Sequence, residues 1–375
     1  MLVTIDKSRS GRVQFFSPAA HPFPGFGPVT HDAPLRSAIH QLAQGASLDR
    51  EATAAAFGVV MRGEASAVQT AALLMGLRGK GETAEETAGA VLALRSAMVA
   101  LETADRDRLV DTCGTGGGLV GTLNISTAAA FVVAGAGVPV AKHGNRSYTS
   151  RSGSADVVES LGIDIHVPPA VASELLESIG FTFLFAPTYH PAMRHAGPVR
   201  KELGVSTIMN LIGPLSNPAG VTRQVVGVGD SNRAMLVART LAALGTRHAM
   251  VLHASVGMDE ISPSGSTLVW EVKDGAVDTW QLEPGRYDLE CADLSRLAGG
   301  SPEENAARIE RLLEGEEDRV ARCAVLLNAA AALYVSANGW SLEEAVTRAE
   351  TSLAGGAAAR VLARLRKAAP RERTT

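Results

Sequence analysis

The sequence has few cysteines, few aromatic residues and no excess of positive charge. Its 375 residues include 3 cysteines, 4% aromatic residues, and 35 Lys and Arg against 39 Asp and Glu, a formal net charge of −4. Three widely spaced cysteines exclude a disulfide framework or a paired-cysteine zinc site, and they favour a reducing cytoplasm. The charge and the scarcity of aromatics argue against nucleic-acid partners. Any site for a phosphorylated ligand must therefore be local.

Long apolar runs are missing as well. The most apolar stretch, 128–141, is interrupted by Gly135, Gly137 and Pro139 and is too short to span a bilayer. Charged residues among the first ten leave no room for a secretory signal. Residues 1–32 are rich in proline and glycine without helical periodicity, which predicts an extended, poorly ordered leader. We therefore expect a cytoplasmic protein with no membrane segment.

Helical periodicity dominates the next part of the chain. Apolar residues recur at three- and four-residue spacing over 35–98 and predict four short helices. We expect Gly45-Ala-Ser47 to cap one helix start, Gly63-Glu-Ala-Ser66 another, and Thr83 to form a capping box with Glu86. The pattern predicts a small helical domain over 33–104, joined by a later helical return near 188–206.

Residues 105–375 have a different texture, in which short apolar runs end at glycine-rich turns and precede helical stretches. This alternation predicts an α/β domain with a mostly parallel central sheet flanked by helices. Helical periodicity continues without strands over 301–365. The expected strands are 109–111, 138–142, 183–185, 225–229 and 249–253. Ligands of such sheets bind at the carboxyl ends of the strands.

The first candidate site follows the strand expected at 109–111. Asp111-Thr-Cys-Gly-Thr-Gly-Gly-Gly118 leads to Gly121-Thr-Leu-Asn-Ile-Ser-Thr127 and then to an apolar helix. Backbone N–H groups and hydroxyls at such a helix start bind phosphate. The spacing fits neither the Walker pattern nor the dinucleotide fingerprint. The alternative is a tight turn with an ordinary helix cap.

The second candidate site follows the strand expected at 138–142. Lys142-His-Gly-Asn-Arg-Ser-Tyr-Thr-Ser150 and Ser152-Gly-Ser-Ala-Asp156 place a cation, an amide, a guanidinium and several hydroxyls close together. Burying so many donors without a ligand would be costly, which favours a binding site. The alternative is a solvated loop.

Two weaker signals remain. The adjacent carboxylates of Asp259 and Glu260 suit Mg²⁺, which prefers oxygen ligands, although such a pair is also common on a solvated surface. His190 and His195 lack a third ligand and are expected to be structural. The planar fork of Arg200 would suit a substrate carboxylate, with a surface salt bridge as the alternative.

Several of these strings together resemble one family, anthranilate phosphoribosyltransferase. The resemblance runs from about Leu35 to Leu365. It rests on Gly63-Glu-Ala65, Lys80-Gly-Glu82, Gly114-Thr-Gly-Gly117, Asn124-Ile-Ser-Thr127, Lys142-His-Gly-Asn-Arg146, Gly153-Ser-Ala-Asp156, Asn210-Leu-Ile-Gly-Pro-Leu215, Asn217-Pro218, Asp259-Glu260 and Leu326-Leu-Asn-Ala-Ala-Ala-Ala332.

The resemblance implies a role for each matching residue. It implies that 5-phosphoribosyl 1-pyrophosphate is held by Gly114, Gly117, Gly118, Thr122, Asn124, Ser126, Thr127, Lys142, Ser150 and Ser154. It implies that anthranilate meets Gly114, His143, Asn145 and Arg200, with Lys142, His143 and Asn145 taking part in catalysis. Two Mg²⁺ ions are implied, one on Ser126 and one on Asp259 and Glu260. The turns that begin at Asp111 and Lys142 are then expected to converge in space on one sugar ester.

The implied function is transfer of the phosphoribosyl group to the amine of anthranilate, a step of tryptophan biosynthesis, by a homodimer. An aniline nitrogen is neutral at pH 7 and needs little base assistance. We therefore expect the amine to attack C1 directly as pyrophosphate leaves, with inversion at C1 and without a covalent intermediate. The alternatives are a nucleoside phosphorylase of related fold and a catalytically silent, nucleic-acid-binding relative.

This chain departs from the family pattern in two places. Gly118 and Leu119 stand where the family usually has Asp-Gly, and Leu123 where it has Phe. Ser206-Thr-Ile-Met-Asn210 stands where the family often has Arg-Thr-Ile-Phe-Asn.

Overall fold

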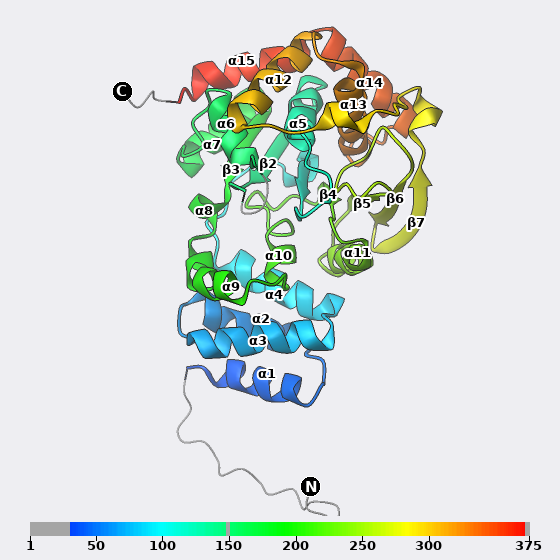
Figure 1. Cartoon of the computed structure of the whole chain (residues 1–375). Helices are drawn as coiled ribbons and strands as arrows, with labels where there is room; N and C mark the ends of the chain where they lie inside the picture. Colours follow the sequence, from blue (N-terminus) through cyan, green and yellow to red (C-terminus); the bar gives the residue numbers. More distant parts are fainter. Residues whose placement is uncertain (1–30, 148–150, 372–375) are drawn as a thin grey trace, which may run out of the picture. The chain divides into compact units, whose positions relative to one another are not determined.

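The structure is a computed structural model that describes residues 31–147 and 151–371 (Figure 1). These residues belong to one compact unit. Two sequence expectations lie outside them: nearly all of the leader expected at 1–32, and Ser150.

Four helices open the described chain, as the periodicity predicts. They are α1 (Ala33–Ala43), α2 (Arg50–Met61), α3 (Ala67–Lys80) and α4 (Ala84–Ser96). Capping boxes at Ser66 and Thr83 begin α3 and α4, as expected. The cap expected at Gly45-Ala-Ser47 is wrong, because Asp49 accepts a hydrogen bond from the Ala52 N–H at 2.7 Å and begins α2 instead.

Short helical elements later in the chain pack on these four helices. They are η2 (Pro191–His195), α9 (Gly197–Leu203) and α10 (Met209–Ile212), and α8 (Ala186–Tyr189) comes directly before them and packs on the strand Phe181–Phe185. Buried residues such as Ala192, Val199 and Ile208 share one hydrophobic cluster with Val60 and Leu74. Segments more than a hundred residues apart in sequence therefore build one helical layer.

Seven strands form two sheets within the described residues. They are β1 (Asp111–Gly114), β2 (Val140–Gly144), β3 (Phe181–Phe185), β4 (Arg223–Gly227), β5 (His248–Ala254), β6 (Thr267–Lys273) and β7 (Ala276–Leu282). The larger sheet has the order β1-β4-β5-β6-β7, in which β1, β4 and β5 are parallel. Strands β2 and β3 form a separate parallel pair, and among the described residues an isolated bridge joins Val140 of β2 to Val110, the residue before β1.

All five expected strands are present, with bounds shifted by at most three residues, and two strands are additional. The additional strands, β6 and β7, form an antiparallel hairpin that extends the sheet beyond β5. Strand β1 begins two residues later than expected, because Asp111-Thr-Cys-Gly114 pairs with β4 although its polar composition is typical of a turn.

The remaining helices cover the strands (Figure 1). They are α5 (Ile125–Gly135), α6 (Ser154–Ser160), α7 (Pro169–Ile179), α11 (Ala234–Ala243), α12 (Pro302–Glu314), α13 (Arg319–Tyr334), α14 (Leu342–Ala354) and α15 (Ala357–Ala368). Short 3-10 turns are η1 (Arg106–Arg108), η3 (Ser231–Arg233), η4 (Pro284–Tyr287) and η5 (Leu294–Leu297). Helix α5 is apolar on all sides, which fits its position packed against α13, α14 and α15.

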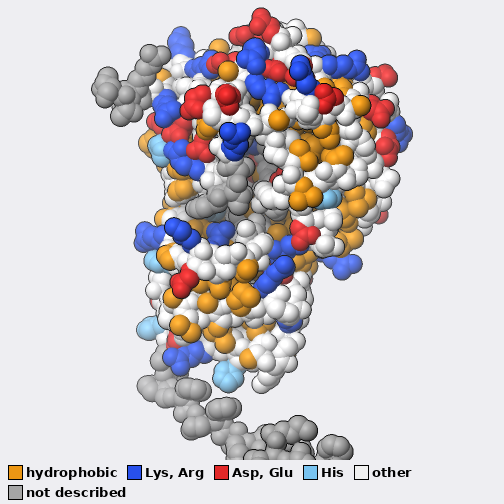
Figure 2. All heavy atoms as spheres, in the orientation of Figure 1, with side chains coloured by type: hydrophobic (Ala, Val, Ile, Leu, Met, Phe, Trp, Pro, Cys, Tyr) orange, Lys and Arg blue, Asp and Glu red, His pale blue; other side chains and the backbone are white. Residues whose placement is uncertain are grey.

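The face of the molecule shown in Figure 2 has no broad field of one sign. Acidic and basic side chains are interspersed on this face, in line with the net charge. Among residues 31–147 and 151–371, no helix is long and apolar enough to cross a bilayer.

Candidate functional site

The two polar turns singled out in the sequence meet in space. The buried ammonium of Lys142, in the middle of β2, donates to the Thr112 carbonyl in β1 at 2.5 Å and lies 3.4 Å from the Ser126 hydroxyl in α5. The backbone N–H of His143 donates to the Asp111 carboxylate at 3.2 Å. The ends of β1 and β2 and the start of α5 therefore form one polar centre.

A buried carboxylate balances the charge of Lys142. Burial raises the pKa of Asp111 to about 6, and the nearby ammonium opposes this increase. Burial likewise lowers the pKa of Lys142, against the attraction of Asp111. Asn217 donates to Asp111 and to the Ala141 carbonyl, both at 2.8 Å, and fixes the carboxylate. Neither Thr112 nor Asn217 was among the residues assigned a role from the sequence, although Asn217 lies in a quoted family string.

The glycine turn after β1 runs against Asp259. Gly116 and Gly117 adopt left-handed backbone conformations, with φ of 68° and 80°. A Cβ atom on Gly114 or Gly118 would lie 3.1 or 2.9 Å from the Asp259 carboxylate oxygens. The turn thus depends on glycine both for its conformation and for its close approach to an acidic side chain.

One of the unusual residues of this turn is highly exposed. Leu119 is 88% exposed, and its N–H donates to the Gly257 carbonyl at 2.9 Å. Its side chain lies over Gly257, where an added Cβ would be 3.0 Å from the Leu119 methyl carbon Cδ1. The substitution at 119 therefore places an apolar side chain on the surface of the turn.

Glu260 reaches the first turn of α5. Its carboxylate accepts hydrogen bonds from the Ser126 N–H at 2.9 Å and from the Thr122 hydroxyl at 3.2 Å. Burial, together with the charge of Asp259, raises the pKa of Glu260 to about 8, and burial also raises the pKa of Asp259. The pair is therefore not the freely solvated surface pair that the sequence left open.

The chemistry of this group suits a divalent ion. Within the part of the chain that the structure describes, no cluster of three His, Cys, Asp or Glu side chains forms a complete metal site. The two carboxylates have raised pKa values, which indicates that the positive charge near them is too small to balance them, and they lie near the Ser126 hydroxyl. Such a group suits Mg²⁺, which binds oxygen ligands and is often also coordinated by phosphates of the substrate. The residues fit magnesium that binds together with a phosphorylated ligand.

Asn124 joins the first turn to the second. It precedes α5 but makes no capping hydrogen bond; its side chain instead donates to the Ser152 carbonyl at 3.3 Å and accepts from Asn305 at 2.9 Å. Thr127 lies one turn further into α5, buried, and its hydroxyl has no partner among the described residues.

The second turn is held by helix α6. The Asn145 carbonyl accepts hydrogen bonds from the Ala155 N–H at 3.2 Å and the Ser154 hydroxyl at 3.4 Å. Arg146 forms ion pairs with Asp156 at 2.7 Å and Glu159 at 2.5 Å. This arrangement orders Asn145 and Ser154 next to each other.

A pair of buried histidines lies beside Lys142. The rings of His143 and His190 are 5.0 Å apart. Burial lowers their pKa values to about 3 and about 4, so both are neutral near pH 7. Nε2 of His143 has no hydrogen-bond partner among the described residues. His195 packs against Gly63, which agrees with the structural role expected for it.

Arg200 occupies a different element. It lies half-buried in the last turn of α9, whereas the other described candidates surround the ends of β1 and β2, the starts of α5 and α6, and the loop after β5.

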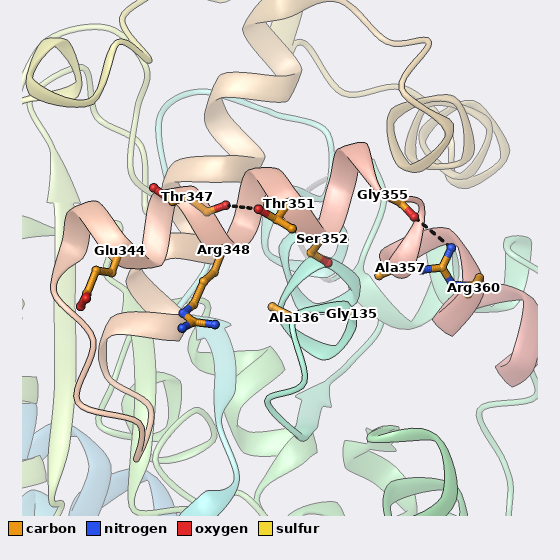
Figure 3. Close-up of a pocket in the computed structure, with 10 residues that line it drawn as sticks. All are labelled: Gly135, Ala136, Glu344, Thr347, Arg348, Thr351, Ser352, Gly355, Ala357 and Arg360. Atoms are coloured by element: carbon orange, nitrogen blue, oxygen red, sulfur yellow. Dashed lines mark hydrogen bonds between the residues drawn. The ribbon is translucent and has the colours of Figure 1, made fainter.

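A small cavity lies at the centre of the strand ends, and a larger groove lies elsewhere. The cavity is lined by Thr112, Cys113, Ser126, Val225, Gly227, Leu252, Asp259, Glu260 and Asn328. The groove, of about 610 Å³, runs between the end of α5 and helices α14 and α15, and none of the candidate residues lines it (Figure 3). The chemistry therefore gathers at the smaller cavity.

Two family models match most of the chain. "Glycosyl transferase family, helical bundle domain" matches residues 36–98, and "Glycosyl transferase family, a/b domain" matches residues 106–359. Anthranilate phosphoribosyltransferase from Rhodopseudomonas palustris (strain BisB18) is 48% identical over 331 residues, which are 88% of this chain and 97% of that protein.

Two solved structures are similar to this chain over most of its length. The chain is similar to anthranilate phosphoribosyltransferase from Thermus thermophilus, with a TM-score of 0.84, 43% identity and coverage of 88% of this chain and 98% of that chain. It is also similar to the enzyme from Saccharomyces cerevisiae in complex with PRPP and Mg, with a TM-score of 0.82, 29% identity and coverage of 90% and 98%.

Proposed function

The chain belongs to the anthranilate phosphoribosyltransferase family and transfers the phosphoribosyl group of 5-phosphoribosyl 1-pyrophosphate to the amine of anthranilate; we propose that the strand-end centre carries out this reaction. Membership of this family favours a transferase rather than a nucleoside phosphorylase or a catalytically silent, nucleic-acid-binding relative. The observation that carries the assignment of the site is the convergence of Lys142, Ser126 and the glycine turn.

The phosphorylated substrate binds along the start of α5 and the glycine turn. Backbone N–H groups of the turn and hydroxyls of the helix start provide donors for an anion, and Lys142 adds a positive charge. The proposed contacts are Gly114, Gly117, Gly118, Thr122, Asn124, Ser126, Thr127, Lys142 and Ser154, to which the sequence adds Ser150.

Magnesium is the proposed cofactor, with two ions per site. A relative is described in complex with PRPP and Mg, and the Asp259 and Glu260 pair with the Ser126 hydroxyl fits such an ion here. When bound, magnesium neutralises the charge that builds up on departing pyrophosphate.

The chain's own residues position the reactants. Lys142, held against Thr112 and Ser126, keeps a positive charge beside the leaving group without having to reorganise. Because His143 is neutral, it orients the acceptor through its ring nitrogens and does not repel a positively charged sugar centre. The amine attacks C1 as pyrophosphate leaves, with inversion and without a covalent intermediate.

The acceptor site completes this arrangement. Asn145 and Gly114 flank the strand-end centre, and Arg200 is the proposed partner of the anthranilate carboxylate, a bidentate contact for which a guanidinium is suited. Holding the two substrates in the reactive orientation lowers the activation free energy by up to roughly 7–11 kcal/mol.

The test is a direct assay. Incubation of the protein with 5-phosphoribosyl 1-pyrophosphate, Mg²⁺ and anthranilate should remove the fluorescence of anthranilate and release pyrophosphate. Phosphorolysis of uridine or thymidine without such transfer would contradict the assignment. Isothermal titration with the sugar pyrophosphate and Mg²⁺ should give a binding signal that Lys142→Ala abolishes.

Three further features belong to the proposal. A homodimer is supported by the exposed apolar side chains Val68 and Met75 on α3 and Leu92 on α4, and light scattering after size exclusion tests it. A division into a helical part over 33–104 and an α/β part over 105–375 agrees with the packing of α1 to α4, and limited proteolysis tests it. A cytoplasmic location agrees with the unpaired thiols of Cys113, Cys291 and Cys323.

A further inference from the structure

A buried guanidinium crosses from the α/β layer to the four N-terminal helices. Arg233 ends η3, just before α11, and its Nη2 donates to the carboxylate of Glu82, in the turn between α3 and α4, at 2.7 Å. The two side chains are 8% and 3% exposed, so the pair is shielded from solvent. Such a pair is strongly affected by removal of one partner, because the remaining charge is left buried.

The same guanidinium holds a third segment. Its Nη1 lies 3.2 Å from the Ser206 hydroxyl and 3.4 Å from the Thr207 carbonyl. Ser206 and Thr207 follow the end of α9 and precede α10. A planar fork with donors on two sides is suited to such a three-way junction, whereas the single ammonium of lysine is not.

The segment that Arg233 holds leads to the candidate acceptor site at both of its ends. Towards the N-terminus, it continues α9, which carries Arg200. Towards the C-terminus, the Thr207 N–H donates to the Asn210 side chain at 3.2 Å, α10 follows, and the backbone of Gly213 lies by the His143 ring, where it opposes the lowering of that ring's pKa. Ordering of residues 204–213 therefore affects both groups assigned to anthranilate.

The opposite end of this segment is tied down separately. Arg95 of α4 donates to the Leu215 carbonyl at 2.7 Å, and Asn217 bonds Asp111. Residues 215–217 therefore keep their place when Arg233 is removed, and the effect should be confined to 204–213.

We propose that Arg233 is a positioning residue of the transferase, which couples Glu82 to the segment 204–213 and so sets the acceptor site. The inference rests on the proposed function for the identity of the acceptor. Arg233 and Glu82 touch no reacting atom, and they act through Arg200 and His143.

Steady-state kinetics of the full chain tests the proposal. Arg233→Gln and Glu82→Gln should each raise the KM for anthranilate about tenfold and leave the KM for 5-phosphoribosyl 1-pyrophosphate within about twofold. The double variant should be no worse than the more affected single variant, because both changes break one ion pair. Arg233→Lys should recover only the part of the loss that comes from the charge beside Glu82, because an ammonium cannot also hold Ser206 and Thr207. The matched control is Arg247→Gln, which breaks an exposed pair with Asp107 at 2.9 Å and should change neither KM.

Two outcomes of the kinetic test would overturn the proposal. One is an equal rise in both KM values, and the other is a lower melting temperature with unchanged kinetics. Hydrogen exchange gives a readout that is independent of activity: Arg233→Gln should speed exchange at residues 206–213, and Arg247→Gln should not. An inactive wild type would contradict the proposed function alone, and unchanged exchange at 206–213 would still contradict the coupling.

Discussion

The carboxylate of Glu260 accepts a hydrogen bond at 2.9 Å from the backbone N–H of Ser126, a residue that precedes it by 134 positions. An N–H group in the first turn of a helix normally lacks a partner within the helix. Here the loop after β5 supplies one, so the acidic loop and the phosphate-binding turn are held together before any substrate arrives.

Burial and the neighbouring charge of Asp259 make an ionised Glu260 costly for stability, and the hydrogen bond from Ser126 offsets only part of that cost. The pKa of Glu260 is about 8 in the folded chain, against an ordinary value of 4.5. Between these pH values the unfolded chain has lost a proton that the folded chain retains, so the folded state loses stability as pH rises through the window. Without ligands, Glu260→Gln should therefore melt higher than wild type at pH 8 and show little difference below pH 4.5.

The same substitution should impair function. Added Mg²⁺ and 5-phosphoribosyl 1-pyrophosphate should raise the melting temperature of wild type and fail to raise that of Glu260→Gln. A variant that still gains stability from the metal would contradict the placement of the ion.

Removal of Lys142 should abolish most activity and also lower stability, because Asp111 is left buried without its neighbouring cation. Lys142→Ala takes away the only cation that contacts Thr112 and Ser126 in the described hydrogen bonds, and we expect kcat/KM to fall roughly 10²–10³-fold. Lys273→Ala, at an exposed strand end, is the control and should retain wild-type rates. Wild-type turnover by Lys142→Ala would refute the assigned role.

Gly227 should tolerate no side chain. A Cβ there would lie 1.5 Å from the Asp259 carbonyl oxygen, so Gly227→Ala must displace the acidic loop. We expect a loss of about 3 kcal/mol in the free energy of unfolding and loss of activity. Gly121→Ala, which meets nothing within 4 Å, is the matched control. Denaturant unfolding of both variants decides the matter, and equal stability would contradict the packing described.

Acid should destabilise the chain through its buried histidines. The pKa of His190 is about 4 when folded, against an ordinary 6.5, so the unfolded chain takes up a proton in this window and the folded chain does not. Each such group removes up to about 1.4 kcal/mol per pH unit as pH falls. Unfolding free energies at pH 6 and 4.5 should differ less in His190→Gln than in wild type. The exposed His40→Gln should match wild type, and an identical slope in all three proteins would contradict this account.

The sequence predicts the architecture well in segments where hydrophobic periodicity and composition favour the same kind of element. The four N-terminal helices and the run of Gly-terminated parallel strands follow from local patterns. The hairpin β6–β7 was missed, although Asp274-Gly275 is a typical hairpin turn, because the alternation of strands and helices favoured parallel crossovers throughout. The cap at Asp49 was missed because glycine and serine nearby were equally good candidates.

Within the site, the convergence of the turns after Asp111 and Lys142 was predicted, and the hydrogen bonds between them confirm it. What the sequence could not give is long-range pairing. Nothing local indicates that Asn217 fixes Asp111, or that Asn328 binds Ile261 next to Glu260 through its side chain at 3.0 and 2.9 Å. Nor does it indicate that Arg233 meets Glu82, 151 residues away. Such contacts depend on the tertiary fold.

The separation of the two sheets has a consequence for the resting enzyme. Glycine-turn residues belong to the large sheet and Lys142 to the small one, and between their strands only Val110 and Val140 form a bridge among the described residues. A substrate that binds both the glycine turn and Lys142 would hold the two sheets together along this boundary, the seam between them. The concentration of substrate would then affect the resistance of the protein to heat and to proteases. Without substrate the two sheets would separate more often than they do in the saturated protein.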